Sequence, residues 1–167
     1  MQPSMKALAG FLTLILVGCA SLFIELVPGS SREPDVIAKF GTPAATRELA
    51  DGSKVLEYPR EPEGRENWRV TLAPDGTVRS VEQLVDEPTF ARIVPGMTRD
   101  QVLEALGRPT EEKSYSVLKE DAVSWRYVEF GNRVMFFNAH FDPSGRLKYT
   151  SRTPDPAANV EGRGSRF

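Results

Sequence analysis

One short motif occurs twice in this sequence, and the repetition limits the fold more than any other feature. The segment IVPGMTRDQVLEALGRP at 93–109 has a counterpart, LVPGSSREPDVIAKFGTP, at 26–43. A single register aligns Phe23, Val27, Pro28, Gly29 and Arg32 with Phe90, Val94, Pro95, Gly96 and Arg99, and the match resumes after one extra residue near Pro34. Because internal repeats indicate duplicated structural units, we expect a tandem pair of similar units.

The segments after the two motifs also correspond, with Pro74 and Gly76 falling on Pro143 and Gly145. Alternating apolar residues and turn dipeptides predict three strands in each unit. These strands are expected at 54–59, 66–73 and 77–84, and again at 124–130, 133–142 and 146–152. The sequence therefore predicts an α+β fold of two tandem repeats, 23–86 and 90–152. Each repeat should be a short helix, or helix pair, packed on a three-stranded antiparallel sheet.

The motif itself has the start and stop residues of a short helix. Thr98 and Gln101 have the spacing of a capping box, and Gly107 with Pro109 forms a stop pairing. In the first copy Ser30 or Ser31 is expected to cap the helix, and Gly41 with Pro43 repeats the stop.

Alternation along the strands assigns the two faces of each sheet. The apolar face should lie under the helix and carries Trp68, Val70, Leu72, Phe137, Ala139 and Phe141. The opposite face of the second sheet is mixed and carries Arg126, Val128, Phe136, Asn138 and His140. Exposed aromatic and arginine side chains are typical interface anchors, so these are candidate protein-binding residues. The alternative is that this face packs on the other repeat.

The N-terminus has the layout of a secretory signal: Lys6, an apolar run over 7–17, then Gly18 and the chain's one cysteine, Cys19. The alternative is an uncleaved transmembrane helix. The repeat argues against this alternative, because 23–29 copies a segment inside the soluble part and leaves roughly 16 apolar residues where a span needs about 20.

The tetrad Leu16-Val17-Gly18-Cys19 resembles the lipobox of bacterial lipoproteins. That resemblance implies a signal peptide over 1–18, a lipidated Cys19 carrying palmitate-type acyl chains, and a short tether over 19–22. In a cell with two membranes, Ala20 after the cysteine would favour the outer one, with the protein on its periplasmic face. A tail at 153–167, rich in proline, glycine and charge, is expected to be disordered.

The sequence lacks the residues that most catalytic sites need. With 21 basic and 23 acidic side chains and no basic run, a nucleic-acid partner is not expected. One histidine and one cysteine leave no metal site and no obvious nucleophile with its base. The acidic pairs Glu111-Glu112 and Glu120-Asp121 fall in an expected loop and are interpreted as solvated surface. No cofactor and no enzymatic activity are expected.

The string GMTRDQVLEALGRP, a variable loop, WRYVEF and a strand ending in FDPSGRLKYTS resembles the SmpA/OmlA, or BamE-like, lipoprotein family over about 94–150. The resemblance implies helices on a three-stranded antiparallel sheet and an accessory role in the complex that assembles outer-membrane β-barrels. In tandem, the same fold resembles the β-lactamase-inhibitor-protein architecture. The leading hypothesis is a non-enzymatic lipoprotein that binds envelope proteins. The alternatives are an inhibitor of a periplasmic enzyme that uses a concave sheet face, and a purely structural envelope lipoprotein.

Overall fold

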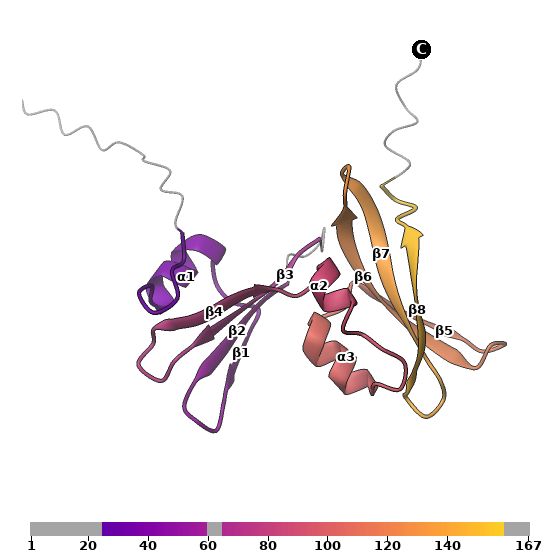
Figure 1. Ribbon diagram of the computed structural model, residues 1–167, viewed down its shortest axis with the longest axis horizontal. Helices are drawn as coiled ribbons and strands as arrows, with labels where there is room; N and C mark the ends of the chain where they lie inside the picture. The colour runs from indigo at the N-terminus through magenta and orange to yellow at the C-terminus, as the bar shows by residue number, and fades with distance from the viewer. Residues whose placement is uncertain (1–24, 60–64, 159–167) are drawn as a thin grey trace, which may run out of the picture.

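The computed structural model describes residues 25–59 and 65–158 as two consecutive units (Figure 1). The first unit contains α1 (Glu33–Phe40), β1 (Ala45–Glu48), β2 (Lys54–Pro59), β3 (Asn67–Leu72) and β4 (Val78–Gln83). The second contains α2 (Glu87–Phe90), α3 (Arg99–Leu106), β5 (Glu111–Tyr115), β6 (Glu120–Glu129), β7 (Arg133–Phe141) and β8 (Leu147–Pro154). Each sheet is antiparallel and has its strands in sequence order. The predicted α+β class is confirmed.

The two units have the same backbone construction. Gly29 N donates to Val78 O in the first unit, and Gly96 N donates to Leu147 O in the second, both at 2.8 Å. Each sheet also has an irregularity at the matching place, between Thr71 and Leu72 in β3–β4 and between His140 and Phe141 in β7–β8. The turn, the helix and the last strand are therefore joined in the same way in both units.

The start of α1 differs from the sequence prediction. Its N-cap is Arg32, not Ser30 or Ser31, and Arg32 N donates to the Asp35 carboxylate at 2.8 Å. Arg32 therefore corresponds to Thr98, the N-cap of α3, so the extra residue of the first copy lies in the turn before the helix. The capping box of Thr98 and Gln101 is confirmed.

The face of the first sheet that carries Trp68, Val70 and Leu72 packs under α1, as predicted. Val36 of the helix is fully buried against Leu56, Tyr58, Val70, Leu72 and Val78. The Phe40 ring lies 5.1 Å from that of Tyr58 and 5.6 Å from that of Trp68. A helix of only eight residues is marginal in isolation, so this apolar contact holds it in place.

The second core is larger because two helices cover its sheet. Val102 and Leu106 of α3 and Phe90 of α2 pack on Trp125, Phe137 and neighbouring apolar residues. The Phe90 ring stacks on that of Phe137 at 4.1 Å. The predicted helix face of this sheet, with Phe137, Ala139 and Phe141, is confirmed.

Each sheet has a fourth strand that the sequence analysis did not predict. Both extra strands, β1 and β5, lie at a sheet edge directly after a helix. Their sequences, ATRE and EEKSY, are short and polar, and their side chains are almost all exposed. Edge strands with charged residues resist unwanted pairing, but they lack the apolar alternation that identifies a strand. The acidic pairs expected in a loop therefore belong to β5 and β6.

Helices α2 and α3 lie between the two sheets (Figure 1). Asn67 of β3 donates its side-chain amide to Leu106 O at 2.9 Å and to Arg108 O at 2.8 Å, just beyond the end of α3. Glu104 of α3 accepts a hydrogen bond from Arg47 of β1 at 3.0 Å. The second unit therefore docks through α3 on the face of the first sheet opposite α1.

Several predictions fall on residues that the structure does not describe, namely 1–24, 60–64 and 159–167. These include the signal peptide, Cys19 and its tether, and most of the tail. The part of the tail that is described is ordered: β8 continues to Pro154, and Asp155 is 3 % exposed. Among the described residues, no helix has the length and apolar character needed to span a membrane.

Candidate functional site

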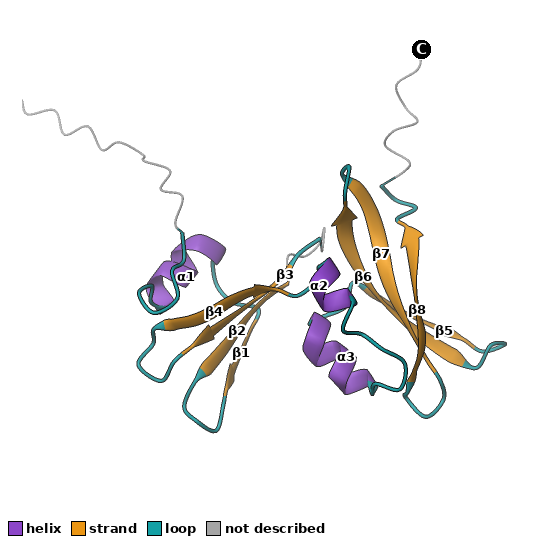
Figure 2. Ribbon diagram, in the orientation of Figure 1, coloured by secondary structure: helices purple, strands orange, loops and turns teal. Residues whose placement is uncertain are grey.

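Within residues 25–59 and 65–158, no helix covers one face of the second sheet, which we call the open face (Figure 2). Cross-strand pairing places Arg126 opposite Phe136, Val128 opposite Val134, Ser124 opposite Asn138 and His140 opposite Tyr149. Side chains directly opposite each other share a face, and the other face carries the core. All five residues proposed from the sequence therefore lie together on the open face. The alternative that this face packs on the first repeat is wrong, because α2 and α3 separate it from the first sheet (Figure 1).

The five residues differ in accessibility. Val128 is 42 % exposed, whereas Phe136 is 6 % and Asn138 8 % exposed, and Arg126 and His140 are half-buried. Only side chains that reach the solvent can anchor a partner, so Phe136 and Asn138 stabilise the face rather than contact another protein. Tyr149 of β8 is 42 % exposed beside His140, yet the sequence analysis did not select it. The sequence signal that could have identified Tyr149 is its place in the same strand as the core residue Leu147, together with its pairing opposite His140.

One end of the open face is held by a cation and an aromatic ring. The Arg126 guanidinium lies 5.3 Å from the centroid of the Phe136 ring, and its Nε lies 2.8 Å from Asp155 Oδ2. Arg126 therefore covers the phenylalanine ring with its side chain while its charge is balanced by a buried carboxylate. This explains why the aromatic side chain of an uncovered sheet face is not itself exposed.

A hydrogen-bonded row crosses the middle of the open face. Ser124 Oγ donates to Asn138 Oδ1 at 2.7 Å, and Asn138 Nδ2 lies 3.2 Å from Thr153 Oγ1 and 3.3 Å from Ser151 Oγ. The asparagine amide thus links β6, β7 and β8 with its donor and acceptor groups both used. Satisfied polar side chains of this kind fix strand register and cost little when buried.

The other end of the open face is organised around Glu120, which is 7 % exposed. Its carboxylate accepts from Lys148 Nζ at 2.8 Å and from the Tyr149 hydroxyl at 3.0 Å, and lies 3.5 Å from His140 Nδ1. The Lys148 hydrogen bond, helped by Tyr149, holds the pKa of Glu120 below its ordinary value of 4.5. The interpretation of Glu120 as a solvated surface carboxylate is therefore wrong: it is the centre of a charged cluster.

In the same cluster, Ser151, His140 and Glu120 follow one another as a row of hydrogen-bonding groups, as a nucleophile, a base and a carboxylate would. His140 Nε2 lies 2.9 Å from Ser151 Oγ, and its Nδ1 faces Glu120. Acyl transfer also needs hydrogen-bond donors aimed at the developing oxyanion. Ser151 lies inside β8 opposite Asn138, so its main chain belongs to the ladder and its hydroxyl to the polar row. The geometry favours a structural hydrogen-bond network over a nucleophilic site.

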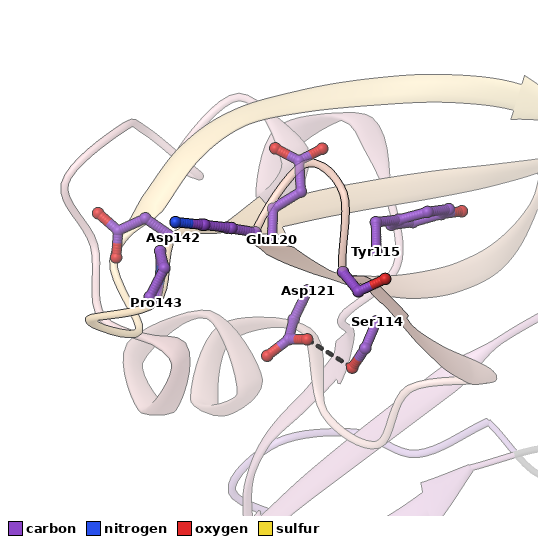
Figure 3. Close-up of a pocket in the computed structure, with 8 residues that line it drawn as sticks. Ser114, Tyr115, Glu120, Asp121, Asp142 and Pro143 are labelled. Atoms are coloured by element: carbon purple, nitrogen blue, oxygen red, sulfur yellow. Dashed lines mark hydrogen bonds between the residues drawn. The ribbon is translucent and has the colours of Figure 1, made fainter.

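A shallow pocket of about 230 Å³ lies at this end of the sheet (Figure 3). Its polar lining includes Ser114, Glu120, Asp121 and Asp142, and Ser114 Oγ donates to Asp121 Oδ1 at 2.6 Å. Asp142 is committed to its own turn, where bonds from Ser144 and from Arg146 N lower its pKa. Within 25–59 and 65–158, no group of three His, Cys, Asp or Glu side chains is placed to hold a metal ion.

A second recess lies between the two units and corresponds to the concavity expected for an inhibitor. It has a volume of about 360 Å³, with Arg69 and Glu82 of the first sheet on one side and Gln101 and Glu104 of α3 on the other. The Arg69 guanidinium lies 3.5 Å from Glu57 and 3.7 Å from Glu104. Its charge is therefore balanced within the chain.

Comparison with known proteins finds one family. Residues 82–129 match the outer membrane protein assembly factor BamE domain. This segment covers α2, α3, β5 and all of β6, and it is shorter than half of the chain. No curated protein matches the sequence.

Three solved structures are distantly similar to this chain. A protein characterised as OsmE, an osmotically inducible lipoprotein, is 19 % identical over 47 % of this chain and 88 % of its own, with a TM-score of 0.37. The DUF4309 family protein YjgB from Bacillus subtilis is 13 % identical over 78 % of this chain and 82 % of its own, with a TM-score of 0.31. A β-lactamase-inhibitor-type protein from Streptococcus mutans is 11 % identical over 74 % of this chain and 82 % of its own, with a TM-score of 0.30.

The BamE match begins at the end of β4, runs through both helices of the second unit and includes Trp125 and Tyr127, which carried the resemblance in the sequence. The resemblance to the BamE-like family is thereby confirmed for residues 82–129.

Proposed function

We propose that this protein is a non-enzymatic lipoprotein of the outer membrane, held on its periplasmic face by lipid on Cys19, which binds an envelope protein through the open face. The BamE match supports the cellular setting, because the matched family is described as an outer-membrane assembly factor. The observation that carries the binding role is the open face itself. It is an ordered, uncovered sheet surface with Val128 and Tyr149 both 42 % exposed.

The chemistry of the open face suits protein recognition. A tyrosine stacked on a histidine at 4.3 Å is a rigid amphipathic contact, and Lys148 lies beside it with its charge held by Glu120. Arg126 lies at the other end of the open face, with its charge held by Asp155. Aromatic side chains with few free rotamers contribute contact area at a small entropic cost. A subunit of the barrel-assembly complex is the partner that the BamE match favours.

The anchor is tested by metabolic labelling with a palmitate analogue in a Gram-negative host. The wild-type chain should incorporate the label and sediment with outer membranes, and the Cys19→Ala variant should do neither. Label on the Cys19→Ala variant, or an unlabelled wild-type chain, would remove the anchor from the proposal.

The inhibitor alternative uses the recess between the units. It expects the purified protein to inhibit an envelope hydrolase at stoichiometric amounts, and it expects substitution of Gln101 to weaken that inhibition. The open face is the better supported surface, because Val128 and Tyr149 on it are each 42 % exposed.

A further inference from the structure

The turn that joins β6 to β7 carries an apolar side chain that is completely exposed. Phe130 is 101 % exposed at the tip of the hairpin. Gly131 and Asn132 follow it with φ of 85° and 60°, so the turn is tight and the tip is a defined protrusion. A phenylalanine placed in this way does not contribute to either core.

The charges next to this tip neutralise each other. Arg133 Nε donates to the Glu129 carboxylate at 3.1 Å, and Arg133 Nη2 bonds the same oxygen. The tip can therefore leave water without burying an uncompensated charge, which would be the main cost of entering an apolar medium.

The tip points to the side of the molecule from which the chain enters α1 (Figure 1). The turns between β1 and β2, β3 and β4, and β7 and β8 lie on the opposite side. Cys19 precedes the first described residue, Glu25, by six positions. Six residues span at most about 20 Å, so a lipid on Cys19 would hold this side of the molecule close to the bilayer.

We propose that Phe130 inserts into the interfacial region of the membrane to which the chain is anchored, as a second contact beside the lipid. This inference rests on the proposed anchor at Cys19. The lipid holds the first unit and Phe130 holds the second, so the two contacts together fix the angle of the open face to the membrane. A single aromatic side chain is enough for this second membrane contact, because the tether keeps the local concentration of the side chain at the membrane surface high.

The hairpin of β5 and β6 is a matched comparison. Its turn carries Val117, 93 % exposed, and Leu118, 61 % exposed. In Figure 1 this turn points sideways, away from the entry of the chain. Nonspecific hydrophobic adsorption would bring both hairpin tips to the membrane, whereas the proposed orientation brings only Phe130 to it.

The test uses the full chain tethered to vesicles of phosphatidylethanolamine and phosphatidylglycerol with brominated acyl chains. Protein lipidated in cells is reconstituted directly, and protein whose Cys19 is free is coupled through that one thiol to a maleimide lipid. The mass of the Cys19 peptide therefore shows whether the proposed anchor exists. The fluorescence of the tethered protein shows separately whether Phe130 enters the membrane interface.

The emission of the Phe130→Trp variant should shift to shorter wavelength and lose up to about a third of its intensity beyond the loss in the unsubstituted chain, because the introduced tryptophan is one of three and its ring would lie at the membrane interface. The Val117→Trp variant should match the unsubstituted chain. Absence of extra quenching in the Phe130→Trp variant, equal quenching in both variants, or quenching in Val117→Trp alone would overturn the proposal.

Discussion

At the scale of single residues, the buried carboxylate of Glu120 shows how an acidic side chain can stabilise this fold. Lys148 and Tyr149 donate to its two oxygens, so the ionised form is favoured in the folded state and the pKa lies below 4.5. A lowered folded-state pKa contributes stability above the ordinary pKa, and that contribution is lost as the pH falls through the folded-state value.

Acid should therefore destabilise the protein partly through Glu120. We predict that the free energy of unfolding of the wild-type chain falls as the pH drops below about 4.5, and that Glu120→Gln flattens this fall while lowering stability at neutral pH. Urea titrations at several pH values between 3 and 7 measure this pH dependence of the free energy of unfolding. Lys148→Met, which removes the strongest cause of the shift, should flatten the profile in the same way. An unchanged slope in both variants would contradict this role of the cluster.

Asn67 joins the two units through its side-chain amide. Its amide group serves two carbonyls of the second unit, those of Leu106 and Arg108. Asn67→Ala leaves both carbonyls without this donor, at a cost of about 2 kcal/mol. Thr46→Ala on the exposed strand β1 is the control and should change stability by less than about 0.5 kcal/mol. Chemical denaturation checks both, and equal effects would refute the importance of the junction.

At the scale of elements, two equivalent helix ends differ in their surroundings. Gly41 after α1 and Gly107 after α3 both have positive φ, at 82° and 71°. A Cβ at Gly41 meets nothing within 4 Å, whereas at Gly107 it would lie 3.1 Å from Leu84 and 3.4 Å from the Asn67 amide. The second helix end is crowded because the first unit packs on it.

Alanine at these two glycines should therefore have unequal effects. Gly41→Ala carries only the cost of a backbone conformation that is essentially restricted to glycine (φ 82°, ψ −159°), about 1–3 kcal/mol, and Gly107→Ala adds the displacement of Leu84 and Asn67. We predict that Gly107→Ala lowers the free energy of unfolding by at least about 1 kcal/mol more than Gly41→Ala does. Thermal or urea unfolding of the pair tests this, and equal losses would show that the junction is loosely packed.

The elements that sequence reasoning predicted are those with an apolar period. The strand expected at 54–59 is β2 itself, and the five other expected strands agree with β3, β4, β6, β7 and β8 to within a few residues. The polar edge strands β1 and β5 were missed because their pairing depends on the neighbouring strand and not on burial. The N-cap of α1 was missed because Asp35 supplies the capping bond from inside the helix.

The candidate site was predictable in position but not in accessibility. Alternation placed Arg126, Val128, Phe136, Asn138 and His140 on one face, and the cross-strand register agrees. It could not show that Arg126 covers Phe136, since that contact depends on Asp155 in the segment expected to be disordered. It also could not show that Glu120 and Lys148, distant in sequence, join the same cluster.

At the scale of the whole molecule, the two units use their sheets differently. The face of the first sheet opposite α1 meets α3, while the face of the second sheet opposite its helices is covered by no helix of the described residues (Figure 1). The first unit thus packs on the helices of the second unit, and the open face of the second unit stays accessible. Two similar units thus leave one sheet face of the described residues uncovered, and this is the face that we propose as the binding surface.

The most direct measurement of this account is site-specific photocrosslinking in intact cells. A benzophenone amino acid replaces Tyr149 on the open face, and Ile37 on α1, which is 45 % exposed, serves as the matched position. We predict a covalent adduct with one envelope protein from position 149 and none from position 37, and the mass of the adduct should correspond to a barrel-assembly subunit. Adducts from position 37 alone, or the same adducts from both positions, would contradict the claim that the open face of the second unit binds the partner.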